Sequence, residues 1–215
     1  MSPNEKEIEA KFYVLDLDRI KSRLLSLEAR LMQERILETN IRFDLPDGGL
    51  SSEGRVLRLR HDTDARLTYK GSSSSEQGVL SRTEIEFVVE DFEKARQFLE
   101  ALGYRRFFYY EKYRTTFELQ TSEVLKTSEV SAQIMLDELP YGNFVEIEGK
   151  DIESIQEIAK RLNLKMDNAV TSSYHMLFIR MCTNYLKLDS TELSFNALQG
   201  LTISSEDLSV QPADG

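Results

Sequence analysis

The chain has 215 residues, of which 40% are hydrophobic and 30% are charged, a composition typical of a globular protein with a substantial core. Its formal net charge of −10 argues against a surface that coats nucleic acid, since such surfaces carry an excess of Lys and Arg. No apolar run approaches the roughly 20 residues that a membrane span needs, and the single cysteine, Cys182, cannot form an intramolecular disulfide. We therefore expect a cytoplasmic protein with neither a nucleic-acid nor a membrane partner.

The first half of the chain alternates strand-like and helical segments. Alternating apolar and polar residues predict four strands, at 5–14, 36–44, 55–61 and 65–70. A helix is predicted over 16–31, where Ile20, Leu24 and two further leucines recur at helical spacing. The Gly- and Ser-rich stretch 71–78 is predicted to be a flexible connector, and a role for it as a lid stays open.

The second half continues in the same way. Further strand-like segments lie at 80–89, 104–119, 131–138 and 143–149. Helices are predicted over 91–102, 151–163 and 172–186. The tetrapeptide at 121–124, Thr-Ser-Glu-Val, recurs at 127–130 and is interpreted as part of a polar loop insertion.

One domain is predicted over 1–186, followed by an extension over 187–215 that is partly helical and then a flexible polar tail, frayed over 200–215. Many antiparallel strands with a few helices indicate an α+β fold. Closure of the sheet on itself would remove its unpaired edges.

Charged side chains two residues apart recur on the predicted strands. Because alternate residues of a strand face the same side, Glu7, Glu9 and Lys11 share one face, and Ile8 and Ala10 share the other. The same-face charges on the other strands are Arg58 and Arg60, Lys70, Glu84 and Glu86, Lys112 and Arg114, and Glu146 and Glu148. For any one strand, a solvated outer face is the simpler interpretation. Taken together, the tight pairs of one sign indicate a site, and in a closed sheet these faces would meet in a lumen with Asp137.

The residue types suggest what such a site would bind. Several Lys and Arg side chains offer more positive charge than a monocarboxylate needs, and Arg suits the bidentate recognition of phosphate. Clustered Glu and Asp oxygens without nearby His or Cys suit Mg²⁺ or Mn²⁺. The pattern therefore indicates metal-assisted phosphoryl chemistry on a polyphosphate.

The ordered series of motifs resembles the CYTH superfamily, also called triphosphate tunnel metalloenzymes, over about residues 5–180. The motifs are Glu7-Ile8-Glu9-Ala10-Lys11, Leu57-Arg58-Leu59-Arg60, Thr68-Tyr69-Lys70-Gly71, Glu84-Ile85-Glu86, Glu111-Lys112-Tyr113-Arg114, Leu136-Asp137, Phe144-Val145-Glu146-Ile147-Glu148-Gly149 and Ser173-Tyr174-His175-Met176-Leu177. The resemblance implies a closed, eight-stranded antiparallel β-barrel with flanking α-helices that holds substrate phosphates and metal inside.

The resemblance also implies a role for each site residue. The implied metal ligands are Glu7, Glu9, Asp137, Glu146 and Glu148, with Glu84 and Glu86 in support. The implied triphosphate-binding residues are Lys11, Arg58, Arg60, Lys70, Lys112 and Arg114. The expected catalytic residues are Lys11, Glu9 and Lys70, and the expected cofactor is Mg²⁺ or Mn²⁺.

Two chemistries of the resembling family fit these residues. We predict first a metal-dependent triphosphatase that hydrolyses inorganic triphosphate or a related organic triphosphate. The alternative is a class IV adenylyl cyclase, which converts ATP to cyclic AMP and pyrophosphate; the second alternative is a noncatalytic binding module for polyphosphate or a nucleotide. The chain has no Trp to stack on a thiamine ring, which disfavours thiamine triphosphate as substrate. A homodimer is compatible with the sequence.

Other reactive side chains are given structural interpretations. His61 and His175 are too few and too far apart to indicate a histidine metal site. Cys182 and the aromatic run 107–110 are interpreted as packing residues. No Gly-rich phosphate loop of the P-loop type occurs in the sequence.

Overall fold

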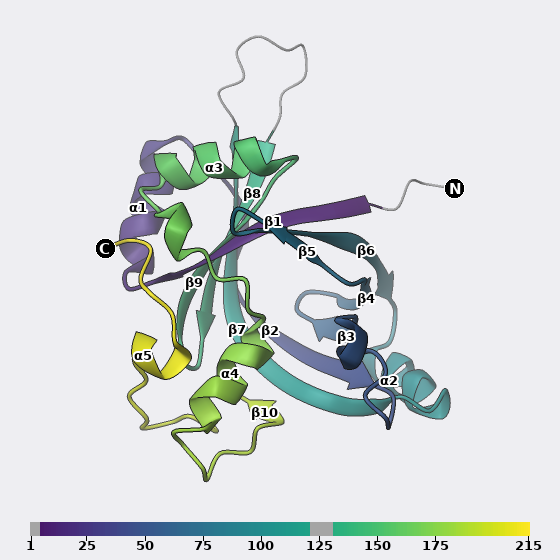
Figure 1. Ribbon diagram of the computed structural model, residues 1–215. Helices are drawn as coiled ribbons and strands as arrows, with labels where there is room; N and C mark the ends of the chain where they lie inside the picture. Colours follow the sequence, from purple (N-terminus) through teal and green to yellow (C-terminus); the bar gives the residue numbers. More distant parts are fainter. Residues whose placement is uncertain (1–4, 121–130) are drawn as a thin grey trace.

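The computed structural model describes residues 5–120 and 131–215 (Figure 1). The polar loop insertion predicted from the repeat at 121–124 and 127–130 lies outside the described residues. None of the helices within the described ranges is long and apolar enough to cross a membrane.

Eight strands close into an antiparallel barrel, as predicted. In the order in which they pair around the ring, they are β1 (Glu5–Val14), β9 (Gly142–Glu148), β8 (Ser131–Leu139), β7 (Arg105–Gln120), β2 (Arg30–Asp44), β3 (Val56–His61), β4 (Ala65–Lys70) and β6 (Val79–Val89). Pairing of β1 with β6 closes the ring. Two short strands lie off the ring: β5 (Ser74–Glu76) forms a hairpin with β6, and β10 (Glu192–Leu193) runs parallel to β7.

In the part of the chain that the structure describes, five α-helices accompany the barrel: α1 (Leu17–Ser26), α2 (Phe92–Ala101), α3 (Ile152–Arg161), α4 (Tyr174–Cys182) and α5 (Ser205–Leu208). Two 3-10 turns complete the elements, at Ser51–Glu53 and Met166–Asn168. Each α-helix begins at an Asp or Ser whose side chain accepts a hydrogen bond from a backbone N–H of the first turn. These caps explain where the helices start.

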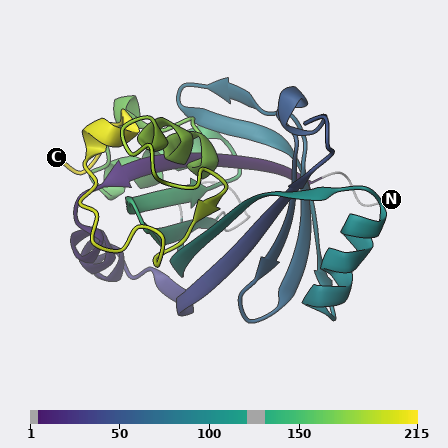
Figure 2. The same ribbon diagram turned by 90° about the horizontal axis from the view of Figure 1, so that it is seen from below.

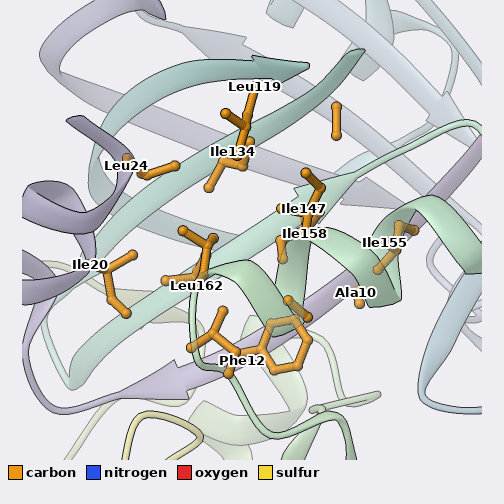
Figure 3. Close-up of a cluster of buried hydrophobic side chains, with 14 of the residues drawn as sticks. Ala10, Phe12, Ile20, Leu24, Leu119, Ile134, Ile147, Ile155, Ile158 and Leu162 are labelled. Carbon is orange, nitrogen blue, oxygen red and sulfur yellow. The ribbon is translucent and has the colours of Figure 1, made fainter. Parts of the chain in front are cut away.

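Helices α1 and α3 cover the outer face of the barrel along β1, β9, β8 and β7. Figure 3 shows Ile20 and Leu24 of α1 and Ile155 and Ile158 of α3 meeting the aliphatic side chains of these strands. All four helical residues are at most 2% exposed. This cluster is the apolar face predicted by the alternation, because its strand residues are the outward partners of the inward charges.

Helix α2 lies on the other side of the barrel from α1, α3 and α5 (Figures 1 and 2). Its Leu99 packs in a second cluster with outward side chains of β2 and β3, including Phe43 and Leu59. Both outer faces of the barrel therefore carry helices, and the strands between them keep their charged faces inward.

Helix α4 closes one end of the barrel. Inward-facing aromatic residues of the strands, Phe108 and Phe144 among them, pack against Leu177 and Phe178 of α4 in a third apolar cluster. The aromatic run 107–110 thus supplies packing residues, as predicted, although three of its members also line the cavity described below.

The chain differs from the sequence prediction between 26 and 44. Helix α1 ends at Ser26 and not at residue 31, because Glu28 adopts a positive φ of 61° and Ala29 N–H bonds back to Leu24 O. Residues 30–44 then form one long strand, which pairs with both β3 and β7. Pairing of Arg30 and Leu31 with β7 stabilises an extended backbone where the leucine spacing suggested a helix.

The connector and the tail also differ from their predictions. Ser74–Glu76 of the predicted flexible connector pairs with β6. In the region expected to be frayed, Leu208 and Ala213 are fully buried. Asp214 accepts hydrogen bonds from Leu15 N and Asp16 N at 3.0–3.1 Å. The polar composition of this tail conceals a few apolar residues and backbone groups that bind the barrel.

Candidate active site

The lumen of the barrel contains a cavity of about 730 Å³. Its wall is made by the inward face of every strand of the ring. The cross-strand register places inward-facing charged residues of neighbouring strands directly opposite one another. Lys11 lies opposite Glu146, Glu9 opposite Glu148, and Lys70 opposite Glu84. The alternation in the sequence therefore does bring the predicted charges together.

All the predicted site residues except one line this cavity. Those on its wall are Glu7, Glu9, Lys11, Arg58, Arg60, Lys70, Glu84, Glu86, Lys112, Arg114, Glu146 and Glu148. Asp137 is fully buried behind the wall, where its carboxylate accepts hydrogen bonds from Lys112 Nζ at 2.8 Å, Arg114 at 2.6 Å and Tyr174 Oη at 2.8 Å. Its position is that of a counter-ion for the cations in front of it.

One part of the wall joins the carboxylates of β1 to cations of β4 and β6. Lys70 Nζ lies 2.5 Å from Glu7 Oε1, and Arg82 bonds to both Glu7 and Glu9 at 2.8 and 3.0 Å. Burial alone would raise the pKa of Glu7, but Lys70 and Arg82 outweigh it and lower this pKa to about 2. Glu7 is therefore a carboxylate at neutral pH.

Glu148 has the opposite environment. Burial raises its pKa to about 7, and the negative charges of Glu7, Glu84 and Glu9 add to the effect, with Lys70 opposing it. Around Glu148, the negative charges of the neighbouring glutamates thus outweigh the positive charge of Lys70.

Arg114 is the centre of a second network. Its guanidinium contacts Asp137 and Glu146 and lies 3.8 Å from Glu38. Burial would lower the pKa of Arg114, yet Asp137 and the two glutamates raise it well above its usual value. Lys11 joins the network at 3.3 Å from Glu146, with its ammonium 4.3 Å from the centre of the Tyr174 ring.

Arginines of β3 make the third part of the wall. Arg58 and Arg60 contact Glu86 at 3.5 and 3.0 Å, and Thr68 Oγ1 donates to Glu86 at 2.7 Å. The Nε atoms of both arginines are nevertheless buried without a hydrogen-bond partner among the described residues, as are both amide atoms of Asn40. Buried donors without partners are costly, so this wall has capacity for an anionic ligand.

The structure adds residues that the sequence analysis did not assign to the site: Glu38, Asn40 and Arg42 of β2, Arg82 of β6, and Tyr174 of α4, which was named only as part of a motif. Glu38, Asn40 and Arg42 alternate with Thr39, Ile41 and Phe43 in a segment predicted to be a strand, and Arg82 lies two residues before Glu84. The alternation of a strand was present in both segments. The inward face of β2 mixes a polar residue with charges of both signs, however, and that of β6 joins Arg82 to two glutamates. Tyr174 reaches Asp137 through helix packing, for which the sequence has no local signal.

The donor set fits a hard divalent cation in its chemistry. Within 5–120 and 131–215, no three Asp, Glu, His or Cys side chains are arranged to hold a metal as they stand. Glu7 and Glu9 bond to Lys70 and Arg82, so metal binding would exchange these pairs. The carboxylate oxygens suit Mg²⁺ or Mn²⁺, and the excess negative charge around Glu148 is what such a cation would relieve.

Comparison with known proteins identifies relatives by sequence and by fold. A Methanocaldococcus jannaschii protein named as a candidate adenylate cyclase is 29% identical over 178 residues, which cover 78% of this chain and 95% of that protein. The X-ray structure of a candidate adenylate cyclase from Vibrio parahaemolyticus superposes with a TM-score of 0.65 at 21% identity, covering 80% of this chain and 97% of the other.

A third relative comes from Hippeastrum. It is described as a candidate adenylyl cyclase with a dominant triphosphatase activity, and it superposes with a TM-score of 0.58 at 15% identity, covering 80% of this chain and 95% of that one. At 21% and 15% identity, these two likenesses concern the fold.

The CYTH domain model matches residues 5–174, which include all the strands of the ring and the first residue of α4. Proteins of this family bind triphosphate substrates and are typically metal-dependent. With its closed barrel and its charged lumen, the chain belongs to the CYTH family.

Proposed function

We propose that this protein is a metal-dependent triphosphatase that hydrolyses the terminal phosphate of inorganic triphosphate or of a related organic triphosphate, with inorganic triphosphate the leading substrate. The observation that carries the proposal is the cavity wall, where cations of several strands face carboxylates of others and arginine Nε atoms lack partners. Such a wall suits a chain of phosphates far better than a singly charged ligand.

The cations would bind and orient the phosphates. In this proposal Arg58 uses its free Nε, and Arg60, whose Nε lies 3.5 Å from Asp62, exchanges part of its carboxylate contacts for contacts with phosphate oxygens. Lys11, Lys70, Lys112 and Arg114 do the same. The carboxylates that pair with these cations in the structure compensate their charge, so that the barrel can fold without a ligand.

Mg²⁺ or Mn²⁺ would be held by Glu7, Glu9, Glu146 and Glu148. When bound, the cation would offset negative charge on the phosphate oxygens during transfer. Asp137 is the expected ligand with the least support, because protein donors already occupy its oxygens.

The reaction itself is a hydrolysis. A water oxygen attacks the terminal phosphorus, the bond from that phosphorus to its bridging oxygen breaks, and inorganic triphosphate yields orthophosphate and pyrophosphate. We assign Glu9 the role of orienting the water and taking up its proton, and Lys11 and Lys70 the role of stabilising charge on the leaving oxygens.

Adenylate cyclisation is the second candidate, favoured by the sequence similarity to the Methanocaldococcus jannaschii protein named as a candidate adenylate cyclase. In that reaction the ribose 3′-hydroxyl of ATP attacks the α-phosphorus and pyrophosphate leaves. The same cations and carboxylates would serve, with the phosphate chain placed differently along the lumen.

Product analysis separates the candidates. The purified protein is incubated with inorganic triphosphate or with ATP, each with Mg²⁺ and with Mn²⁺, and orthophosphate, pyrophosphate and cyclic AMP are quantified. The proposal expects orthophosphate and pyrophosphate in equal amounts from inorganic triphosphate. Cyclic AMP with equimolar pyrophosphate from ATP would make the cyclase the function, and tight binding of either compound without any product would favour a noncatalytic binding module.

Cytoplasmic location and homodimer formation remain predictions from the sequence.

A further inference from the structure

Arg42 differs from the other cations of the cavity wall. It lies on β2 and lines the cavity, yet no carboxylate of the described residues is within 4 Å of its guanidinium. Each of the other lysines and arginines on the wall has at least one such partner within the described part of the chain. Among the described residues, Arg42 is thus the cation of the wall that has no carboxylate at ion-pair distance.

The surroundings of Arg42 make this charge costly. Its cross-strand neighbours are Arg58, which is also cationic, and Phe108. The guanidinium lies 5.6 Å from the centre of the Phe107 ring, a cation–π contact that offsets only part of the cost. Its Nε is buried and has no hydrogen-bond partner among the described residues. Burial lowers the pKa of Arg42 and the neighbouring Arg58 lowers it further, whereas Tyr110 and the more distant carboxylate of Asp44 offset only part of this. A partly buried cation next to another cation destabilises a protein unless an anion joins them.

A local irregularity of the barrel holds Arg42 in this place. The register of β2 and β7 shifts between Arg42 and Phe43, so that Arg42 pairs with Phe108 and Phe43 pairs with Arg106. Phe107 is the extra residue, and its side chain joins Arg42 on the wall of the cavity. Bulges of this kind often aim side chains at functional sites.

The topology fixes where an anion at Arg42 would lie. Strand β2 is four strands away from β1 in either direction around the ring of eight, so Arg42 belongs to the strand opposite the one that carries Glu7 and Glu9. A phosphate that pairs with Arg42 is therefore held by the wall opposite β1. A chain of several phosphates, unlike orthophosphate, offers charged groups to both walls.

We propose that Arg42, together with the free Nε of Arg58, binds a phosphate group of the triphosphate substrate on the wall of the lumen opposite β1. The inference rests on the proposed function in that it takes a triphosphate as the ligand. It adds a binding residue and assigns to it a stability cost in the absence of ligand.

The test uses Arg42→Met, which keeps an unbranched apolar stem of similar reach and removes the charge. Arg35→Met is the matched control, because Arg35 lies on the same strand, is half exposed, and pairs with Glu138. Arg42→Lys keeps the charge and removes the planar fork. Calorimetry with inorganic triphosphate in EDTA gives the dissociation constant without turnover, and thermal unfolding without ligand gives Tm.

The proposal expects Arg42→Met to weaken binding of inorganic triphosphate by about tenfold or more, with a Tm no lower than that of the wild type. Arg42→Lys should bind with intermediate affinity, and Arg35→Met with wild-type affinity. Unchanged affinity in Arg42→Met, or an affinity and a Tm that fall together, would overturn the proposal.

The outcome is independent of hydrolysis. A wild-type protein that binds inorganic triphosphate but releases no product would refute the triphosphatase, and the affinity of Arg42→Met would still decide the role of Arg42. A wild-type protein that does not bind inorganic triphosphate in EDTA would overturn the role of Arg42, and the product analysis with Mg²⁺ and Mn²⁺ would still decide the triphosphatase.

Discussion

At the scale of single residues, the lumen contains two kinds of charge. Arg114 and Glu38 are enclosed by opposite charges and hold the barrel wall together, whereas Arg42 has no opposite charge within 4 Å among the described residues. The same residue type therefore has different consequences on neighbouring strands. The stability contribution of a buried charge depends on its partners, because removal of one partner leaves the other charge buried, unpaired and poorly solvated.

Removal of Arg114 should test the first kind. Arg114→Met leaves Asp137 and Glu146 with fewer cations, and we expect the free energy of unfolding to fall by about 3 kcal/mol or more. Denaturant unfolding measures this loss. The exposed pair of Arg35 and Glu138 provides the comparison, since Arg35→Met should cost about 1 kcal/mol or less. Equal losses in the two variants would show that the Arg114 network contributes no more than a surface pair.

Glu38 should make stability depend on acid pH. Burial would raise its pKa, but Lys112 and Arg114 lower it from 4.5 to about 2. A carboxyl whose pKa is lowered on folding stabilises the protein above its unfolded pKa, and this contribution disappears as pH falls from about 4.5 towards 2. We expect a loss on the order of 2–3 kcal/mol from this residue across that interval.

The comparison variant is Glu38→Gln, which cannot titrate. Its unfolding free energy, measured by denaturant titration at several pH values, should be lower than that of the wild type at pH 6 and should fall less steeply below pH 4.5. Parallel pH curves for the two proteins would exclude this role for Glu38.

Sequence patterns identified the site residues unequally. Pairs of one sign, such as Arg58 with Arg60, were found because a solvent-facing strand rarely repeats one charge. Glu38 and Arg42 were missed because Asn40 separates two opposite signs, which is what an ordinary surface strand shows. Only the closed register reveals that this mixed face is also inward.

At the scale of elements, strand β2 shows the limit of periodicity. Leu27 and Leu31 continue the helical spacing of α1, so the predicted helix ran to residue 31. The backbone turns at Glu28, and Leu31 is then a strand residue with 41% of its surface exposed. Tertiary pairing with β7 decides the conformation there, and a short window of sequence carries no information about this pairing.

The C-terminal segment 208–214 is an element that composition concealed. Ala213 N–H bonds to Tyr13 O, Lys165 N–H bonds to Ala213 O, and the Asp214 carboxylate accepts two backbone N–H groups at the start of α1. Most of these bonds use the backbone, which hydropathy does not report. The segment ties β1, α1 and the turn before α4 together.

Asp214→Asn should loosen this connection. The amide keeps one acceptor oxygen and loses the charge, so we expect the free energy of unfolding to fall by about 1–3 kcal/mol. Asp167→Asn is the control at an exposed site in the nearby 3-10 turn. Chemical unfolding of the two variants measures the difference, and an Asp214→Asn variant as stable as the control would mean that the segment binds through its backbone alone.

At the scale of the whole molecule, barrel closure converts a one-dimensional pattern into a site. In an open sheet, the faces of β1 and β2 would lie far apart and face solvent; in the closed ring they lie on opposite walls of one lumen. The alternation of charged and aliphatic residues was sufficient to predict an α+β protein with charged strand faces, and the order of motifs indicated the barrel. The plugging of one end by α4 and the counter-ion position of Asp137 depend on three-dimensional packing, which no local pattern encodes.

The central claim is that inward carboxylates and cations of one lumen perform metal-dependent hydrolysis of a triphosphate. It is tested most directly by Glu9→Gln, because this variant removes a single charge from the wall at a residue that contacts only Arg82 among the ion pairs of the described residues. Orthophosphate release from inorganic triphosphate is measured with Mg²⁺ and with Mn²⁺, beside the control Glu118→Gln, a partly exposed glutamate that pairs with Arg30 and does not line the cavity. We predict that Glu9→Gln lowers turnover by about a hundredfold or more while unfolding stays cooperative, and that the control turns over like the wild type. Wild-type turnover in Glu9→Gln would contradict the account.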